Sequence, residues 1–208
     1  MKKTNDNMTI GSLPLNMLFF CIPLIFSNLL QILFNMCDIA VVGRFAGSSS
    51  LGSVGSAATL VTLFTGIIIG IGSGVNVLTA RYLGEDAKDK VMKTVHSSLF
   101  ICFFTGIILM ICGILLAKPM LRLFNTRADL LDGAALYIRI YFLGMPALGI
   151  YNFGNAVLSA AGDTKKPLYY LSVAGVVNII LNLVLVIVFK LDVAGVAIAS
   201  VAAQYVSA

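Results

Sequence analysis

The chain has 208 residues, of which 59% are hydrophobic and only 11% are charged, and its formal net charge is +5. Soluble domains carry about 25% charged residues, so this composition excludes a soluble globular domain and predicts a polytopic membrane protein. The basic residues are spread over polar connections. This spread favours lysines and arginines that flank a membrane and argues against nucleic-acid binding.

The cysteines predict neither a metal site nor a disulfide framework. All four lie in apolar runs without a C-x-x-C pair: Cys21, Cys37, Cys102 and Cys112. We expect them to be small core hydrophobes.

The first membrane span is predicted at residues 14–42, after a polar tail at residues 1–11 that shows no signal-peptide cleavage site. Leu13 to Met36 is uncharged, and a bilayer crossing needs about 20 apolar residues. Pro23 removes a backbone hydrogen bond in mid-span and predicts a bend there.

A polar stripe runs along this span through Asn28, Gln31, Asn35 and Asp38. At about 100° per residue, these side chains lie within an arc of roughly 80°. Such a stripe must face a helical bundle or a wet cavity, because unsatisfied polar groups are costly in lipid. Every other acidic residue lies in a tail or a connecting stretch, so Asp38 is the main functional candidate. A purely structural role, in which Asp38 bonds Asn35 or Gln31, remains open.

The second span is predicted at residues 54–83, after a compact turn formed by Gly43, Arg44, Gly47 and Ser48 to Ser50. Within the span, Gly66, Gly70 and Gly74 repeat every four residues. This small-xxx-small pattern predicts close helix packing, with a flexible hinge as the alternative.

The third span is predicted at residues 95–117, between two polar connections. Residues 84–96 are highly charged and predict an aqueous loop or a short amphipathic helix. The single histidine, His96, lies at this boundary and is expected to be solvated. The second connection runs from Lys118 to Asp132.

The fourth span, at residues 131–161, is interrupted by Pro146 and carries a second polar stripe. Its members are Tyr137, Tyr141, Asn152, Asn155 and Ser159. The stripe favours interhelical hydrogen bonding and cavity lining equally.

The fifth span is predicted at residues 168–189, with Asn178 and Asn182 on one face. Residues 193–208 are apolar but short of a full crossing, so we expect them to be the start of a sixth helix in a longer protein. Eight lysines and arginines lie on the N-terminal side of the predicted bundle and six on the other, which favours a cytoplasmic N-terminus.

Three separated motifs resemble the multidrug and toxic compound extrusion (MATE) transporters. They are the stretch from Pro23 to Arg44, the sequence AGDTKKP at residues 161–167, and the pair Asn178 and Asn182 followed by GVAIAS at residues 195–200. The resemblance implies an all-α membrane bundle of twelve helices in two six-helix lobes. This chain would then be most of the N-terminal lobe, with five complete spans and the start of a sixth, and the C-terminal lobe would be missing.

The resemblance also implies a multi-pass protein of the cell membrane that exports small cationic or amphiphilic compounds in exchange for H⁺ or Na⁺, with no other cofactor. Asp38 would couple the cation, together with Asn178, Asn182 and Ser200, and Pro23 would bend its helix. We expect the substrate cavity to include Gln31, Asn35, Tyr137, Tyr141, Asn152 and Asn155. In this sequence Asn182 replaces the acid of some members, Ser200 replaces a threonine, and Arg81 is a further departure.

The sequence also bears on three other functions. A lipid-linked oligosaccharide flippase of the same superfamily favours a cationic cavity, but no lysine or arginine lies mid-span. An intramembrane enzyme needs a motif such as G-x-S-x-G or H-E-x-x-H, and the sequence contains neither, so we predict that the protein is not an enzyme. A non-transporting structural fragment is the remaining alternative.

Overall fold

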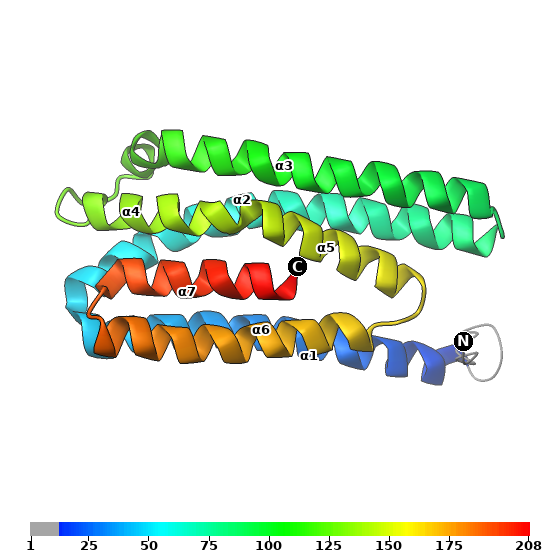
Figure 1. The fold of residues 1–208 in the computed structure, drawn as a ribbon, viewed down its shortest axis with the longest axis horizontal. Helices are drawn as coiled ribbons and strands as arrows, with labels where there is room; N and C mark the ends of the chain where they lie inside the picture. The colour runs from blue at the N-terminus through cyan, green and yellow to red at the C-terminus, as the bar shows by residue number, and fades with distance from the viewer. Residues whose placement is uncertain (1–12) are drawn as a thin grey trace.

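The computed structural model describes residues 13–208, and the described part of the chain is a helical bundle (Figure 1). The predicted polar tail, residues 1–11, lies outside the described residues. The elements in chain order are α1 (Leu13–Val41), the π-helix η1 (Val42–Ala46), α2 (Gly47–Gly84), α3 (Lys88–Leu123), α4 (Leu131–Tyr141), the 3-10 helix η2 (Phe142–Gly144), α5 (Met145–Ala160), α6 (Lys165–Leu183), the π-helix η3 (Val184–Val188) and α7 (Asp192–Ser207).

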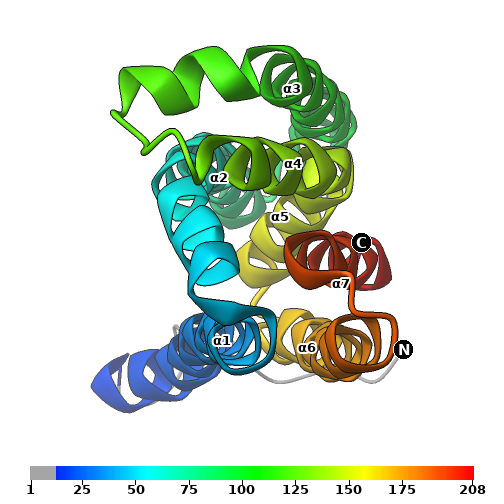
Figure 2. The ribbon, with the colours of Figure 1, turned by 90° about the vertical axis from the view of Figure 1, so that its left-hand side faces the viewer.

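Four helical stretches of the described chain are long and apolar enough to cross a membrane, and the first of them runs for 65 residues from Phe20 to Gly84. At 1.5 Å per residue this stretch is about 100 Å long, which is more than three bilayer cores, so it has to turn back. It does so at η1, and Figure 2 shows the first part of α2 crossing the end of the bundle.

The corner between α1 and α2 differs from the predicted compact turn. The chain keeps a helical path through η1, and the three serines begin α2. Gly47 has φ +85°, a conformation that glycine adopts at no steric cost. A π-helical segment and one glycine therefore turn the chain without a loop.

Two groups of helices make up the bundle. α1 packs along α6, while α2, α3, α4 and α5 pack on one another. α7 lies between the two groups and contacts both α6 and α4 (Figure 2). The main core is buried between α2, α3, α4, η2 and α7. In it, Phe64 of α2 and Phe142 of η2 meet edge to face at 5.0 Å between ring centroids.

Close helix packing occurs at glycines other than those predicted. A Cβ atom at Gly106 of α3 would lie 2.6 Å from the Cα atom of Pro146, so α3 and α5 touch backbone to backbone. At Gly66, Gly70 and Gly74 a Cβ atom would meet nothing within 4 Å. The prediction of close packing at this repeat is therefore wrong for the described chain, in which the repeat faces outward from α2.

The predicted interruption at Pro146 is confirmed. Proline has no backbone N–H, so it cannot donate to the carbonyl group of Phe142, four residues earlier. The chain tightens into η2 at this point, and the Met145 N–H donates to that carbonyl group instead. Tyr205 of α7 donates its hydroxyl to the Leu143 carbonyl oxygen at 3.1 Å and ties α7 to this break.

The polar connections around α3 are shorter than predicted. Only residues 85–87 separate α2 from α3, and the helix continues past Lys118 to Leu123. His96 is exposed on α3, as expected for a solvated residue. Lys118 pairs with Asp132 at 2.7 Å and links the end of α3 to the start of α4.

Candidate functional site

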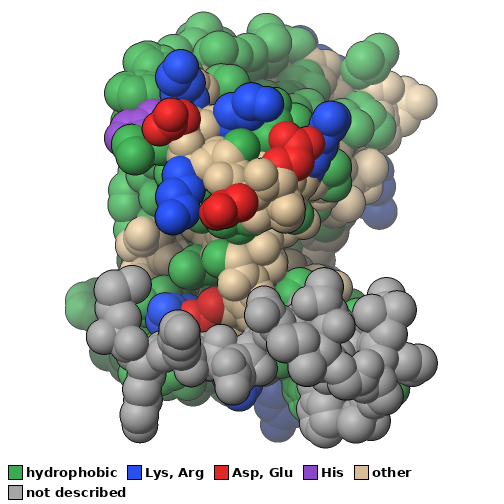
Figure 3. All heavy atoms as spheres, turned by 90° about the vertical axis from the view of Figure 1, so that its right-hand side faces the viewer, with side chains coloured by type: hydrophobic (Ala, Val, Ile, Leu, Met, Phe, Trp, Pro, Cys, Tyr) green, Lys and Arg blue, Asp and Glu red, His purple; other side chains and the backbone are tan. Residues whose placement is uncertain are grey.

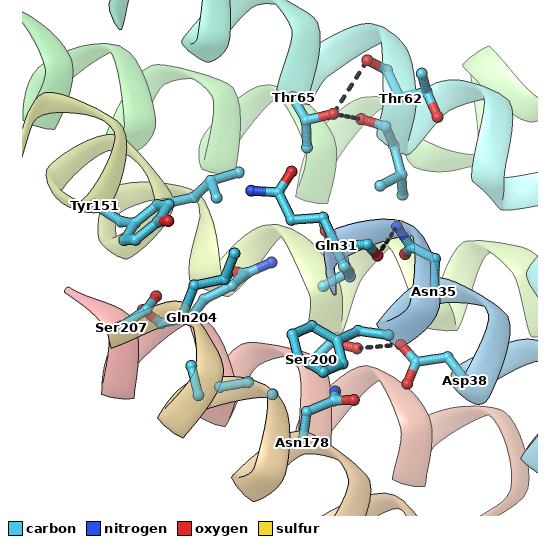
Figure 4. Close-up of a pocket in the computed structure, with 18 of the residues that line it drawn as sticks. Gln31, Asn35, Asp38, Thr62, Thr65, Tyr151, Asn178, Ser200, Gln204 and Ser207 are labelled. Carbon is cyan, nitrogen blue, oxygen red and sulfur yellow. Dashed lines mark hydrogen bonds between the residues drawn. The ribbon is translucent and has the colours of Figure 1, made fainter. Parts of the chain in front are cut away.

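A cavity of about 400 Å³ lies between the two groups of helices (Figure 4). This volume is within the range of small-molecule sites, which is roughly 300–1,000 Å³. Its polar side chains come from α1, α2, α4, α5, α6 and α7, namely Gln31, Asn35, Asp38, Thr62, Thr65, Tyr137, Tyr141, Tyr151, Asn152, Asn178, Ser200, Gln204 and Ser207. Asp38 is the only charged residue among the described residues that line it.

Asp38 is held at the junction of α1, α6 and α7. The amide nitrogen of Asn182 donates a hydrogen bond to Oδ1, and the Ser200 hydroxyl donates to Oδ2 at 3.1 Å. The same Asn182 nitrogen also donates to Asn178 Oδ1 at 3.2 Å. The four residues predicted to form a cation site therefore lie in one hydrogen-bonded cluster. Figure 4 shows three of them, Asp38, Asn178 and Ser200.

The close approach of α1 to α6 depends on a glycine. Phe34 of α1 lies against Gly175 of α6, where an added Cβ atom would be only 1.7 Å from the ring. Asn178 and Asn182 follow Gly175 by one and two helical turns, so they face α1 on the same side of α6. The glycine thus lets α1 approach the helix that carries the asparagines.

Asp38 is 7% exposed, and its carboxylate forms no salt bridge with any described residue. A buried charge without a counter-charge is costly unless hydrogen bonds, a proton or a cation compensate it. The cluster also contains an unused acceptor, because the buried Asn182 Oδ1 has no hydrogen-bond partner in the described chain. The site can therefore accept a proton or a small cation.

The structural interpretation in which Asp38 bonds Asn35 or Gln31 is wrong. Asn35 donates its side-chain amide to the Gln31 carbonyl oxygen at 3.1 Å and not to Asp38, and the Gln31 side chain forms no hydrogen bond with Asp38. The carboxylate is bonded from α6 and α7 and not from its own helix. The stripe on α1 also begins later than predicted, since Asn28 is exposed and does not line the cavity.

The second predicted stripe divides between two environments. Tyr137, Tyr141 and Asn152 line the cavity, and the two tyrosine rings stack with centroids 5.7 Å apart. Asn155 does not line it. Its Oδ1 accepts a hydrogen bond from the Ser159 hydroxyl of the same helix at 3.3 Å.

Pro23 is buried within a continuous α1, one turn before Ser27. The Ser27 hydroxyl donates to the Pro23 carbonyl oxygen at 3.0 Å. This side-chain bond is made one turn after the position where proline, which has no N–H, leaves out a backbone hydrogen bond. The bending role of Pro23 stays a prediction.

Sequence reasoning missed several lining residues. Thr62 and Thr65 of α2 and Tyr151 of α5 carry no periodic signal that separates them from ordinary residues of an apolar span. Gln204 and Ser207 were detectable, because they follow Ser200 at offsets of four and seven and so share its helix face.

Arg81, the charged residue that departs from the family pattern, lies at one end of the bundle. Arg81 is exposed at the end of α2 and donates to Glu85 at 2.9 Å. Figure 3 shows this end, where Lys, Arg, Asp and Glu side chains gather. Of the cysteines, Cys102 is buried as predicted, Cys37 and Cys112 are half-buried, and Cys21 is exposed, so the prediction of a core position is wrong for Cys21.

Comparisons with known proteins agree with this architecture. The MatE family model matches residues 23–184. The chain is 33% identical over 172 residues to "Probable multidrug resistance protein YoeA" of Bacillus subtilis (strain 168), with 83% of this chain and 37% of that protein covered. It is 28% identical to "Probable multidrug resistance protein YpnP" of the same organism, with 95% and 44% covered. The chain thus spans about 40% of the length of these relatives.

Solved structures show the same fold. "Crystal structure of MATE in the straight conformation" superposes with a TM-score of 0.85 at 23% identity and covers 91% of this chain and 42% of that chain. "Outward-facing conformation of a multidrug resistance MATE family transporter of the MOP superfamily" superposes with a TM-score of 0.84 at 22% identity, with 89% and 41% covered. Because the family model matches most of this chain, the chain belongs to the MatE family of multidrug and toxic compound extrusion proteins.

Proposed function

We propose that the protein exports cationic or amphiphilic compounds by antiport with H⁺ or Na⁺, and that Asp38 is the coupling group. The observation that carries this proposal is the position of Asp38. It is the only charged side chain that lines the cavity among the described residues, and it has no salt-bridge partner there. An intramembrane carboxylate in this setting is a functional candidate in its own right.

The coupling follows from competition for one carboxylate. A proton can neutralise Asp38, or Na⁺ can take oxygen ligands from Asp38, Asn178 and Ser200. The unpartnered Asn182 Oδ1 is a further oxygen for a small cation. A cationic substrate that approaches Asp38 competes with either ion. Exclusive occupancy then links the inward flow of the ion to the outward flow of the substrate.

The cavity chemistry supports the substrate class. Stacked Tyr137 and Tyr141, together with Phe34 and Tyr151, offer aromatic surface for flat or amphiphilic molecules. Aromatic faces and one carboxylate favour cations over anions. A relative from Shewanella oneidensis (strain ATCC 700550), 24% identical, is named "FAD transporter". An anionic dinucleotide is not part of our proposal for this chain, because no lysine or arginine is among the described residues that line the cavity.

The lack of lysine and arginine among the described lining residues also counts against the flippase alternative, since an anionic lipid-linked oligosaccharide requires cationic groups in the cavity. In our proposal the N-terminus is cytoplasmic, the membrane is the cell membrane, and a C-terminal lobe completes the cavity. The non-transporting fragment alternative predicts that no ion-driven export occurs when the full-length protein is reconstituted.

The test is Asp38→Asn in the full-length protein. The amide keeps the size of the side chain but can neither titrate nor carry charge, so coupled export of ethidium from proteoliposomes should be abolished. Removing a buried charge should leave folding and membrane insertion near normal. Asp86→Asn is the matched control, because Asp86 is an exposed loop residue with φ +51°, which asparagine tolerates.

Purified yield and efflux are measured on the same preparations. Normal yield with lost efflux supports the proposal. An Asp38→Asn protein that still moves ethidium uphill under an ion gradient removes Asp38 from the mechanism. One that does not accumulate, while Asp86→Asn does, assigns Asp38 to structure.

A further inference from the structure

The α4 helix has an outer face that the cavity does not use. Tyr137 and Tyr141 line the cavity, and Arg139 lies about 160° around the helix from both of them. The exposed residues of α4 share one arc of about 60°, and they are Asp132, Leu136 and Arg139. This exposed row therefore faces away from the cavity.

Arg139 lies within the apolar stretch of α4 and not in the polar connection before it. It follows the start of the helix at Leu131 by eight residues, which is about 12 Å along the axis. The stretch from Leu131 to Ala160 is long and apolar enough to cross a membrane. On either side of Arg139, Leu136 and Leu143 are 47% and 44% exposed. The arginine thus stands on a surface that suits acyl chains.

An arginine at this depth needs an anion or water within its reach, because a charge in lipid is costly. Arg139 forms no ion pair with any described residue. Side chains tilt towards the N-terminus of their helix, which for α4 is the nearer end of the bundle, and a long arginine can extend along an apolar surface to the interface. Arg139 can therefore bring an uncompensated charge to the level of the lipid headgroups.

The end of α3 adds two basic side chains beside this row (Figure 1). Lys118 lies 2.7 Å from Asp132 and joins α3 to the row. Arg122 follows Lys118 by four residues and shares its helix face, and it is exposed and forms no ion pair with a described residue. Ile111 precedes Lys118 by seven residues on the same face and is 48% exposed. Lys118, Arg122, Asp132 and Arg139 form a basic rim next to an apolar surface.

We propose that this basic rim binds an anionic phospholipid of the leaflet at the α3–α4 end of the bundle. Arg139 and Arg122 would hold the phosphate group, because a guanidinium group can donate two parallel hydrogen bonds to phosphate oxygens. The acyl chains would lie along Leu136 and Leu143. Charge complementarity selects this occupant, since the rim carries three basic side chains and one carboxylate. The site is separate from the cavity and does not depend on antiport.

The experiment compares two lipids with the same acyl chains, dioleoyl phosphatidylglycerol and dioleoyl phosphatidylcholine. Their binding to the purified full-length protein is measured by native mass spectrometry. Wild type should bind the anionic lipid about tenfold more tightly, and Arg139→Gln should lower this preference about fivefold. Arg122→Gln should act in the same direction. Equal binding of the two lipids to wild type overturns the proposal.

Arg127→Gln is the matched control, because it removes the same charge from an exposed arginine in the α3–α4 connection. Arg127 donates to both carboxylate oxygens of Asp129, at 3.1 and 3.0 Å, so its charge is already compensated. The lipid preference should change less than twofold. An equal loss in Arg127→Gln and Arg139→Gln would reflect net charge alone and would overturn the site.

A second variant keeps Arg139 and changes what it can bind. Leu136→Glu places a carboxylate three residues before Arg139 on the same exposed row, where the two side chains can pair. It should lower the preference at least as much as Arg139→Gln, and an unchanged preference contradicts the proposal. Inorganic phosphate at millimolar concentration should not displace the bound phosphatidylglycerol. Displacement would assign the basic rim to soluble anions and overturn a lipid site.

Discussion

Asn182 donates its side-chain amide to the Asp38 carboxylate across 144 residues of sequence. This bond brings α6 onto α1, and Ser200 adds α7 from the other side of the carboxylate at 3.1 Å. Three helices thus converge on one carboxylate, and under the proposed function a change in what occupies Asp38 would act on all three.

Asn182→Ala should slow cation-coupled export about tenfold or more without abolishing it. The substitution removes one donor to Asp38 and leaves the Ser200 bond in place, and a hydrogen bond to a charged group contributes about 1.5–3 kcal/mol. Initial efflux rates in proteoliposomes measure the effect. Ser73→Ala is the control, because Ser73 is exposed and bonds only its own helix at 3.0 Å. Wild-type rates in Asn182→Ala would exclude this residue from the coupling site.

Gly175→Ala should lower the thermal stability of the protein. Its Cβ atom would lie 1.7 Å from the Phe34 ring, and overpacking of this kind costs about 1–3 kcal/mol. Gly70→Ala is matched to it, because a Cβ atom there meets nothing within 4 Å and alanine is the better helix former by about 0.5–1 kcal/mol. Melting curves in detergent should show a lower Tm for Gly175→Ala only. Equal Tm values for the two variants contradict the close α1–α6 contact.

Cysteine labelling tests the membrane orientation. Ser49 lies in the first turn of α2, and Lys88 lies beyond the far end of this 38-residue helix, at the opposite end of the bundle (Figure 1). After removal of the four native cysteines, a cysteine at Ser49 should react with an impermeant maleimide in intact cells. A cysteine at Lys88 should react only after permeabilisation. The reverse pattern would show that the N-terminus faces outward.

Asp163→Asn should lower stability at neutral pH. Lys166 lies 2.7 Å from the carboxylate and holds the pKa of Asp163 below its ordinary value. Because the folded-state pKa is depressed, the stabilisation is present above about pH 4 and is lost as the pH falls through the lower folded-state pKa. The ion pair is partly exposed, so we expect a loss of less than about 1 kcal/mol at pH 7.

Thermal unfolding of wild type and Asp163→Asn at pH 7 and at pH 3 measures this effect. The difference in stability should shrink at the lower pH, where the wild-type carboxylate begins to bind a proton. A difference that stays the same at both pH values contradicts the ion-pair explanation. It would point to the backbone N–H of Lys166, which donates to Asp163 Oδ1 at 3.3 Å.

Much of the fold was predictable because the membrane simplifies the physics. Backbone groups in lipid must bond within their own segment, so long apolar runs become helices whatever their neighbours are. The break at Pro146 followed equally directly from a missing N–H. The helical corner at η1 could not be predicted in this way, because glycines and serines favour a turn locally. Only the packed bundle shows that a π-helix turns the chain at this point.

The sequence by itself determined that Asp38 is an isolated carboxylate in a membrane span, because composition and hydropathy decide which residues enter lipid. Only the tertiary structure decided its partners. Periodicity shows which side chains share a helix face but not which faces meet, and here the contact of Phe34 with Gly175 sets how closely α1 and α6 approach. For the same reason, the packing of α7 on the break at Gly144, and with it the position of Gln204, emerged only when the helices were placed together.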